Sequence, residues 1–204
     1  MLSRTHVNKK EIMNRLFYMI LCILISTGMA VGQSSGDNQG ITMKGKPITL
    51  LGTKAYIGEM APDFTGIDSN MKEVKLSDFK GKVVVLSVFP SVDTKVCAAQ
   101  TRRFNEEASG LGKDVVVLTL SKDLPFALER FCAAEGIDRI YTLSDYRESE
   151  FGMNYGFLIK ENKLLTRGVV VIGKDGKITY VQYVKDISQE PDYKAAIAAV
   201  KKAK

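Results

Sequence analysis

The 204-residue chain has no tryptophan, a single histidine and only three cysteines. The histidine, His6, and one cysteine, Cys22, lie within the first 32 residues, which have the pattern of a removable segment. Without that segment the chain has no histidine for cysteine–histidine catalysis, for a metal site or for the usual haem ligation. We therefore expect no metal and no cofactor, and we look for chemistry at Cys97 and Cys132.

A large excess of charge of one sign is also lacking. The net charge is +6, but residues 1–32 contribute four basic residues and one acidic residue to it. The rest of the chain has 25 basic and 22 acidic residues, scattered along its length. Binding to nucleic acid needs concentrated positive charge, so we expect no nucleic-acid partner.

Residues 1–32 have the pattern of a secretory signal peptide. Arg15 precedes an apolar run from Leu16 to Ile25, and Ala30-Val31-Gly32 supplies the small residues of a cleavage site. The run is shorter than the roughly 20 apolar residues that a membrane-spanning helix needs. We expect cleavage near Gly32 and export to the periplasm.

The alternative is an uncleaved N-terminus that anchors the protein to the inner membrane. The sequence also leaves open whether translation starts at Met1 or at Met13. A lipoprotein is disfavoured because Leu21 precedes Cys22, where lipid attachment requires a small residue. The polar, glycine-rich residues 33–42 predict a flexible leader, and residues 43–204 then form one domain.

Alternating strand and helix signals run through this domain. Buried strands are predicted at 82–89, 115–120 and 140–143, a hairpin at 169–184 with its turn at 173–176, and an N-terminal hairpin around 48–51. Helices are predicted at 94–109, 126–134, 148–155 and 193–202, with Gly110 ending the first and Asp123 capping the second. This order predicts an α/β, thioredoxin-like fold: a central mixed sheet flanked by helices, with an N-terminal β-hairpin extension.

Cys97 follows the first buried strand, in the first turn of a predicted helix. The free backbone N–H groups and the dipole at a helix start favour negative charge, and the thiolate is the reactive form of cysteine. Thr94 lies one turn earlier, where its hydroxyl can bond the sulfur or an incoming oxygen. Pro90 ends the strand and can shield the site without adding a donor.

The spacing Pro-x3-Thr-x2-Cys, formed by Pro90, Thr94 and Cys97, is the pattern of the peroxiredoxins. The segments PSVDTKVCAAQTRRFNEEA, SKDLPFALERFCAAEGI, TLSDYRESEFGMNYG and TRGVVVIGKDG resemble thiol peroxidases, an atypical 2-Cys peroxiredoxin subfamily, in order and spacing. The resemblance extends from about Met43 to Lys201.

The resemblance implies a thioredoxin-dependent peroxidase that acts on hydrogen peroxide and organic hydroperoxides. Cys97 would attack the O–O bond and become a sulfenic acid, which Cys132 of the same subunit would resolve as a Cys97–Cys132 disulfide. Thr94 and Arg167 match the residues that hold the peroxide oxygens. The resemblance also implies a homodimer and a thioredoxin-like protein reductant.

The residues themselves leave alternatives open. The two cysteines could form an inert structural disulfide in a binding module, and Arg167 could be a surface charge at a strand start. An exported thiol–disulfide oxidoreductase acting on proteins is a further alternative, although Cys97-Ala-Ala-Gln lacks the second cysteine of a Cys-x-x-Cys motif. A disulfide requires Cα atoms within about 7 Å, so cysteines held farther apart would need the helices to unwind locally.

Overall fold

A computed structural model describes residues 40–203, which belong to one compact unit, Ser34–Lys204. The predicted signal peptide and most of the predicted leader lie outside the described residues. The strands are β1 (Thr42–Met43), β2 (Lys46–Pro47), β3 (Leu50–Leu51), β4 (Thr65–Ile67), β5 (Glu73–Lys75), β6 (Val83–Val88), β7 (Val115–Ser121), β8 (Tyr141–Ser144), β9 (Leu158–Ile159), β10 (Gly168–Ile172) and β11 (Ile178–Tyr183). The helices are η1 (Leu76–Phe79), α2 (Lys95–Leu111), α3 (Pro125–Glu135), α4 (Glu150–Asn154) and α5 (Tyr193–Lys202).

A mixed seven-stranded sheet forms the centre of the domain, in the order β11-β10-β6-β7-β8-β4-β5. β6, β7 and β8 are parallel, whereas β10 pairs antiparallel with both β6 and β11. All six residues of β6 are buried, as expected for an apolar strand covered on both faces. The predicted thioredoxin-like arrangement of parallel strands followed by an antiparallel hairpin is confirmed.

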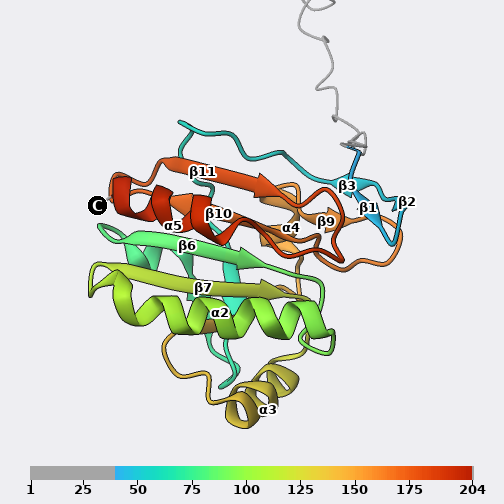
Figure 1. The fold of residues 1–204 in the computed structure, drawn as a ribbon, viewed down its shortest axis with the longest axis horizontal. Coiled ribbons are helices and arrows are strands. Elements are labelled where there is room, and N and C mark those ends of the chain that lie inside the picture. Colours follow the sequence, from blue (N-terminus) through green and yellow to red (C-terminus); the bar gives the residue numbers. More distant parts are fainter. Residues whose placement is uncertain (1–39, 204) are drawn as a thin grey trace, which may run out of the picture. The chain divides into compact units, whose positions relative to one another are not determined.

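Helices cover both faces of this sheet (Figure 1). On one face, α2 and α5 pack through Phe104, Ala196 and Val200 against alternate valines of β6 and β10. On the other face, Phe151 of α4 joins a cluster that contains Leu86 and Leu118. The two clusters use opposite sides of the same strands because successive side chains of a strand point to opposite faces.

The N-terminal extension differs from its predicted position. The hairpin is formed by β1 and β2, before residues 48–51, and β3 instead pairs with β9, a strand that the sequence pattern did not predict. Ile187, in the segment between β11 and α5, donates its N–H to the carbonyl of Thr42 at 3.0 Å and packs in a cluster with Ile41 and Leu50. The extension is therefore tied to the C-terminal part of the domain.

Two predicted helix boundaries are wrong. Gly110 lies inside α2, which ends at Leu111 and is followed by Gly112 at φ 83°, a conformation that favours glycine. Asp123 does not cap α3, because the N-cap position is taken by Leu124 and has no side-chain hydrogen bond. Within residues 40–203, no helix is both long enough and apolar enough to cross a membrane.

Candidate active site

Cys97 lies at the start of α2, which follows β6 along the chain, at the edge of the sheet where the parallel strands end. Pro90 is buried at the end of β6, and Thr94 is the N-cap residue of α2. The N–H of Cys97 donates to the Thr94 hydroxyl oxygen at 3.4 Å. This capping contact places the cysteine in the first helical turn, as predicted from the sequence.

The sulfur of Cys97 accepts two hydrogen bonds in a site closed to solvent. The Thr94 hydroxyl donates to it at 2.8 Å, and the Nη2 of Arg167 donates at 3.1 Å. Cys97 is 0% exposed, so water competes little with either donor. Two donors, one of them cationic, stabilise negative charge on a sulfur atom.

Arg167 is 1% exposed, so the alternative interpretation as a surface charge is wrong. Its Nε donates to the carbonyl of Ile187 at 2.8 Å, and its Nη1 donates to Oε1 of Gln100 at 2.5 Å. A buried guanidinium is costly unless it is hydrogen-bonded, and here all three of its nitrogens have partners. These bonds fix the direction in which Nη2 points at Cys97.

Gln100 belongs to this site, although the sequence pattern did not single it out. Its Nε2 donates to the Ser87 hydroxyl at 2.8 Å and to the carbonyl of Val88 at 3.3 Å, which leaves Oε1 directed at Arg167. Gln100 follows Cys97 by three residues, which places both on one face of α2. That spacing was the signal available in the sequence.

An apolar cluster covers the sulfur. Phe89, Val92 and Leu128 surround Cys97, and Phe131 packs against them. Leu128 and Phe131 come from α3, so the helix that carries Cys132 also forms part of the enclosure around Cys97. None of these apolar side chains can compete as a hydrogen-bond donor to the sulfur.

Cys132 is half-buried on α3, and both described cysteines are free thiols. Its sulfur lies 3.6 Å from the hydroxyl oxygen of Thr142 on β8. Burial raises the pKa of the Cys132 thiol, and the hydrogen bond with Thr142 partly opposes that rise. The two sulfurs thus have separate partners, Thr94 and Arg167 for Cys97 and Thr142 for Cys132.

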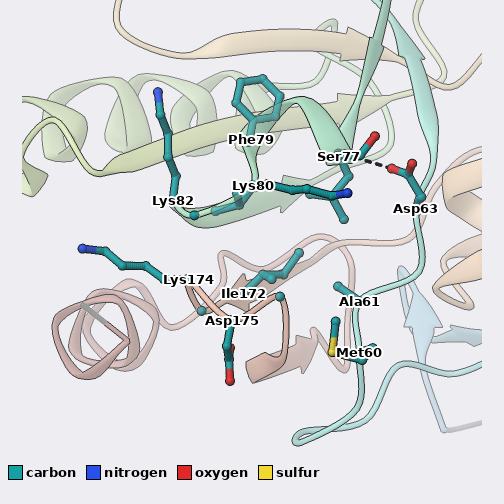
Figure 2. Close-up of a pocket in the computed structure, with 15 residues that line it drawn as sticks. Met60, Ala61, Asp63, Ser77, Phe79, Lys80, Lys82, Ile172, Lys174 and Asp175 are labelled. Carbon is teal, nitrogen blue, oxygen red and sulfur yellow. Dashed lines mark hydrogen bonds between the residues drawn. The ribbon is translucent and has the colours of Figure 1, made fainter.

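A cavity of about 450 Å³ lies elsewhere in the domain, lined in part by Phe79, Val84 and Ile172 (Figure 2). The strand register pairs Val84 with Ile172 and Val88 with Gly168. Cys97 follows the Val88 end of β6, so this cavity lies at the opposite end of the strand. It is therefore not the place where a reactant would meet Cys97. Among residues 40–203, no group of three or more histidine, cysteine or carboxylate side chains is placed to hold a metal ion.

The site can be compared with known proteins. A family model described as Redoxin matches residues 57–197. Thiol peroxidases from Oceanobacillus iheyensis and Bacillus subtilis are each 52% identical to this chain, over 79% of it and over 98% and 96% of their own lengths. The chain belongs to the thiol peroxidase family. A thiol peroxidase is an oxidoreductase that reduces peroxides with thiols, so the predicted enzyme class is confirmed.

Solved structures agree with this assignment. A peroxiredoxin-like protein from Aquifex aeolicus is 36% identical, with a TM-score of 0.76 over 80% of this chain and 96% of its own. The thiol peroxidase from Chromobacterium violaceum is 18% identical with a TM-score of 0.71, over 79% of this chain and 95% of its own, and at that identity it supports the fold alone. The peroxiredoxin fold predicted from the sequence is thus shared with both solved structures.

Proposed function

We propose that Cys97 is the peroxidatic cysteine of this thiol peroxidase and that Cys132 is its resolving cysteine. The observation that carries the assignment is the sulfur of Cys97, which is buried between the Thr94 hydroxyl and the Arg167 guanidinium. Cys132 has no cationic partner among the described residues, and burial keeps its pKa raised. The two thiols are therefore suited to different steps.

In the first step the Cys97 thiolate attacks one oxygen of the peroxide and the O–O bond breaks. Cys97 is oxidised to the sulfenic acid, and the peroxide is reduced to an alcohol, or to water from hydrogen peroxide, once the leaving oxygen takes up a proton. Thr94 and Arg167 already donate to the sulfur and would donate to the peroxide oxygens as negative charge moves onto them. Pro90 closes one side of the site without offering a donor.

In the second step the sulfur of Cys132 attacks the sulfur of the Cys97 sulfenic acid. An S–S bond forms, and the hydroxyl of the sulfenic acid leaves as water with the proton of the Cys132 thiol. The Cys132 sulfur is hydrogen-bonded with Thr142 on β8, so it must leave Thr142 for this step, and we propose that α3 moves or unwinds to let it reach Cys97. Leaving its buried position would also lower the barrier to ionising the Cys132 thiol.

A thioredoxin-like dithiol donor would then reduce the Cys97–Cys132 disulfide, and the overall role would be antioxidant defence and redox homeostasis. We further propose a homodimer and export to the periplasm, where the donor must be periplasmic or supplied through the membrane. The competing assignment, disulfide exchange with protein substrates, fits less well. A sulfur that is 0% exposed must first be uncovered, and a small peroxide needs a much smaller opening than another protein does.

The roles of the cysteines can be separated by substitution in the full chain. Cys97→Ser should abolish peroxide reduction, whereas Cys132→Ser should react with one equivalent of peroxide and then stop as a sulfenic acid. Cys22→Ser provides a matched control and should behave as wild type. Peroxide consumption and trapping of the sulfenic acid with dimedone would measure these outcomes. A single turnover by Cys97→Ser but not by Cys132→Ser would show that the two roles are reversed.

A further inference from the structure

Asp123 joins the segment before Cys97 to the segment before α3. Its Oδ1 accepts a hydrogen bond from the Ser91 hydroxyl at 2.6 Å. Its Oδ2 accepts from the N–H of Val92 at 2.9 Å and from the Ser121 hydroxyl at 2.8 Å. Its backbone carbonyl accepts from the Ser144 hydroxyl. One half-buried aspartate thus connects the Cys97 loop with the ends of β7 and β8.

These contacts explain why Asp123 does not cap α3, although its position in the sequence suggested a cap. Both carboxylate oxygens are directed away from the helix, toward Ser91, Val92 and Ser121. The helix α3 therefore begins just after Asp123, which is held by these hydrogen bonds, but its own N-cap position has no side-chain hydrogen bond. A helix without a cap lacks about 1 kcal/mol of stabilisation at its first turn.

Beyond Asp123, α3 is attached to the domain by few residues. Its fully buried residues, Pro125 and Leu128, both lie in its first half, whereas in its second half Phe131 is only partly buried against the cluster around Cys97 and Cys132 is half-buried. Figure 1 shows α3 at the margin of the domain, below α2. Segments with few buried apolar contacts open at low cost in free energy. The part of α3 that carries Cys132 is therefore the part that can detach.

We propose that Asp123 is a positioning residue for disulfide formation, which holds the base of α3 against the Cys97 loop while the rest of α3 rearranges. The inference rests on the proposed function, in which the Cys97 sulfenic acid and the Cys132 thiol combine with loss of water. Cys132 follows Asp123 by nine residues. A short tether with one fixed end keeps a reactive group at high effective concentration.

The proposal distinguishes two steps of one reaction. The structure gives Asp123 no hydrogen bond with Cys97, Thr94 or Arg167, so we expect its substitution to change the peroxide step much less than disulfide formation. A sulfenic acid that waits longer for Cys132 meets more peroxide and is converted to the sulfinic acid. The partition between disulfide and sulfinic acid therefore reports on Asp123, because a loss of stability that only made α3 detach more readily would shift it the other way, toward the disulfide.

The test is Asp123→Asn in the full chain, because the side-chain amide keeps the size but has one acceptor oxygen instead of two, so it cannot accept the hydrogen bonds of both Ser91 and Val92. After one equivalent of hydrogen peroxide, quenched alkylation and mass spectrometry would follow the Cys97–Cys132 disulfide. We expect it to form about tenfold more slowly, the effect of losing one hydrogen bond to a charged group. At higher peroxide the sulfinic acid should accumulate at lower concentrations than in wild type.

Asp138→Asn, in the loop after α3, is the matched control, because it removes one negative charge and only a 3.7 Å contact with Arg139. The peroxide step is measured separately in the Cys132→Ser background. If Asp123→Asn does not fold, Ser91→Ala can replace it, because it removes one hydrogen bond to the carboxylate. We expect Ser91→Ala to slow disulfide formation and to favour the sulfinic acid as well, but by a smaller factor.

An unchanged or faster disulfide step in the Asp123 variant, or an equal slowing of both steps, would overturn the inference. If only Ser91→Ala can be measured, the inference is overturned when this variant forms disulfide and sulfinic acid in the same proportion as wild type. Absence of a Cys97–Cys132 disulfide in the wild-type protein would instead refute the proposed function, so the two failures are distinguishable.

Discussion

Replacing Arg167 with methionine removes the cation from the site while keeping an unbranched side chain of similar length. The guanidinium makes three hydrogen bonds, to Ile187, Gln100 and the sulfur of Cys97. Methionine can make none of them, so the thiolate loses its cationic partner. The carbonyl of Ile187 and Oε1 of Gln100 also lose their Arg167 donor. Each buried group left without a partner costs about 1–3 kcal/mol of stability.

The catalytic effect can be sized in the same way. Loss of one preorganised donor from a buried site lowers the rate by about 10²–10³. We expect this decrease in the rate constant for the reaction of Cys97 with hydrogen peroxide.

Stopped-flow measurement of a single turnover in the Cys132→Ser background isolates this step, and thiolate absorbance measured against pH reports ionisation of Cys97. Arg139→Met, at an exposed arginine, provides the control for the general effect of the substitution. Arg167→Lys should restore part of the rate, because it returns the charge without the fixed directions of the guanidinium. An Arg167→Met variant that is folded and has unchanged rate and ionisation would refute the role assigned to Arg167.

Two further predictions concern stability and processing. Burial raises the pKa of Asp145 to about 6, despite hydrogen bonds from the N–H groups of Phe151 and Gly152. The folded protein therefore binds this proton more tightly than the unfolded chain. This contribution to the free energy of unfolding should be greatest below about pH 4 and should fall by a few kcal/mol as the pH rises through 6. Urea titrations at several pH values would show this slope, and Asp145→Asn should flatten it; equal slopes would contradict the assignment. For the N-terminus, expression in a bacterial host should yield a periplasmic protein whose first residue is near Gln33. N-terminal sequencing of cell fractions would decide, since a full-length chain in the membrane pellet would indicate an anchor and a full-length soluble chain would indicate no export.

Features encoded by local pattern were predictable from the sequence. β6 and β7 are continuous apolar runs, and α5 has the predicted bounds because its apolar periodicity and its N-cap Asp192 agree. The Pro90–Thr94–Cys97 spacing likewise marked the site, since it depends on one strand, one loop and one helical turn.

Features that depend on distant partners were not predictable. β3 pairs with β9, a segment more than 100 residues away, and neither two-residue strand has a pattern of its own. Asp123 resembled a helix cap, but hydrogen bonds with Ser91, Val92 and Ser121 determine its direction instead. The spacing of Gln100 from Cys97 places it on the same face of α2, but its role could not be predicted, because that role depends on contacts with Arg167 and with Val88 at the end of β6.

The contact between Thr42 and Ile187 limits how far this enzyme can be shortened from its N-terminus. Ile187 donates its N–H to Thr42 and accepts at its carbonyl the hydrogen bond from the Nε of Arg167. Processing near residue 33 leaves this chain of contacts intact, whereas a cut a few residues beyond Ile41 would remove one end of it. Proteolytic trimming at that point would thus reduce activity without touching any residue next to the sulfur. Tagged or truncated versions should therefore retain Ile41 and Thr42.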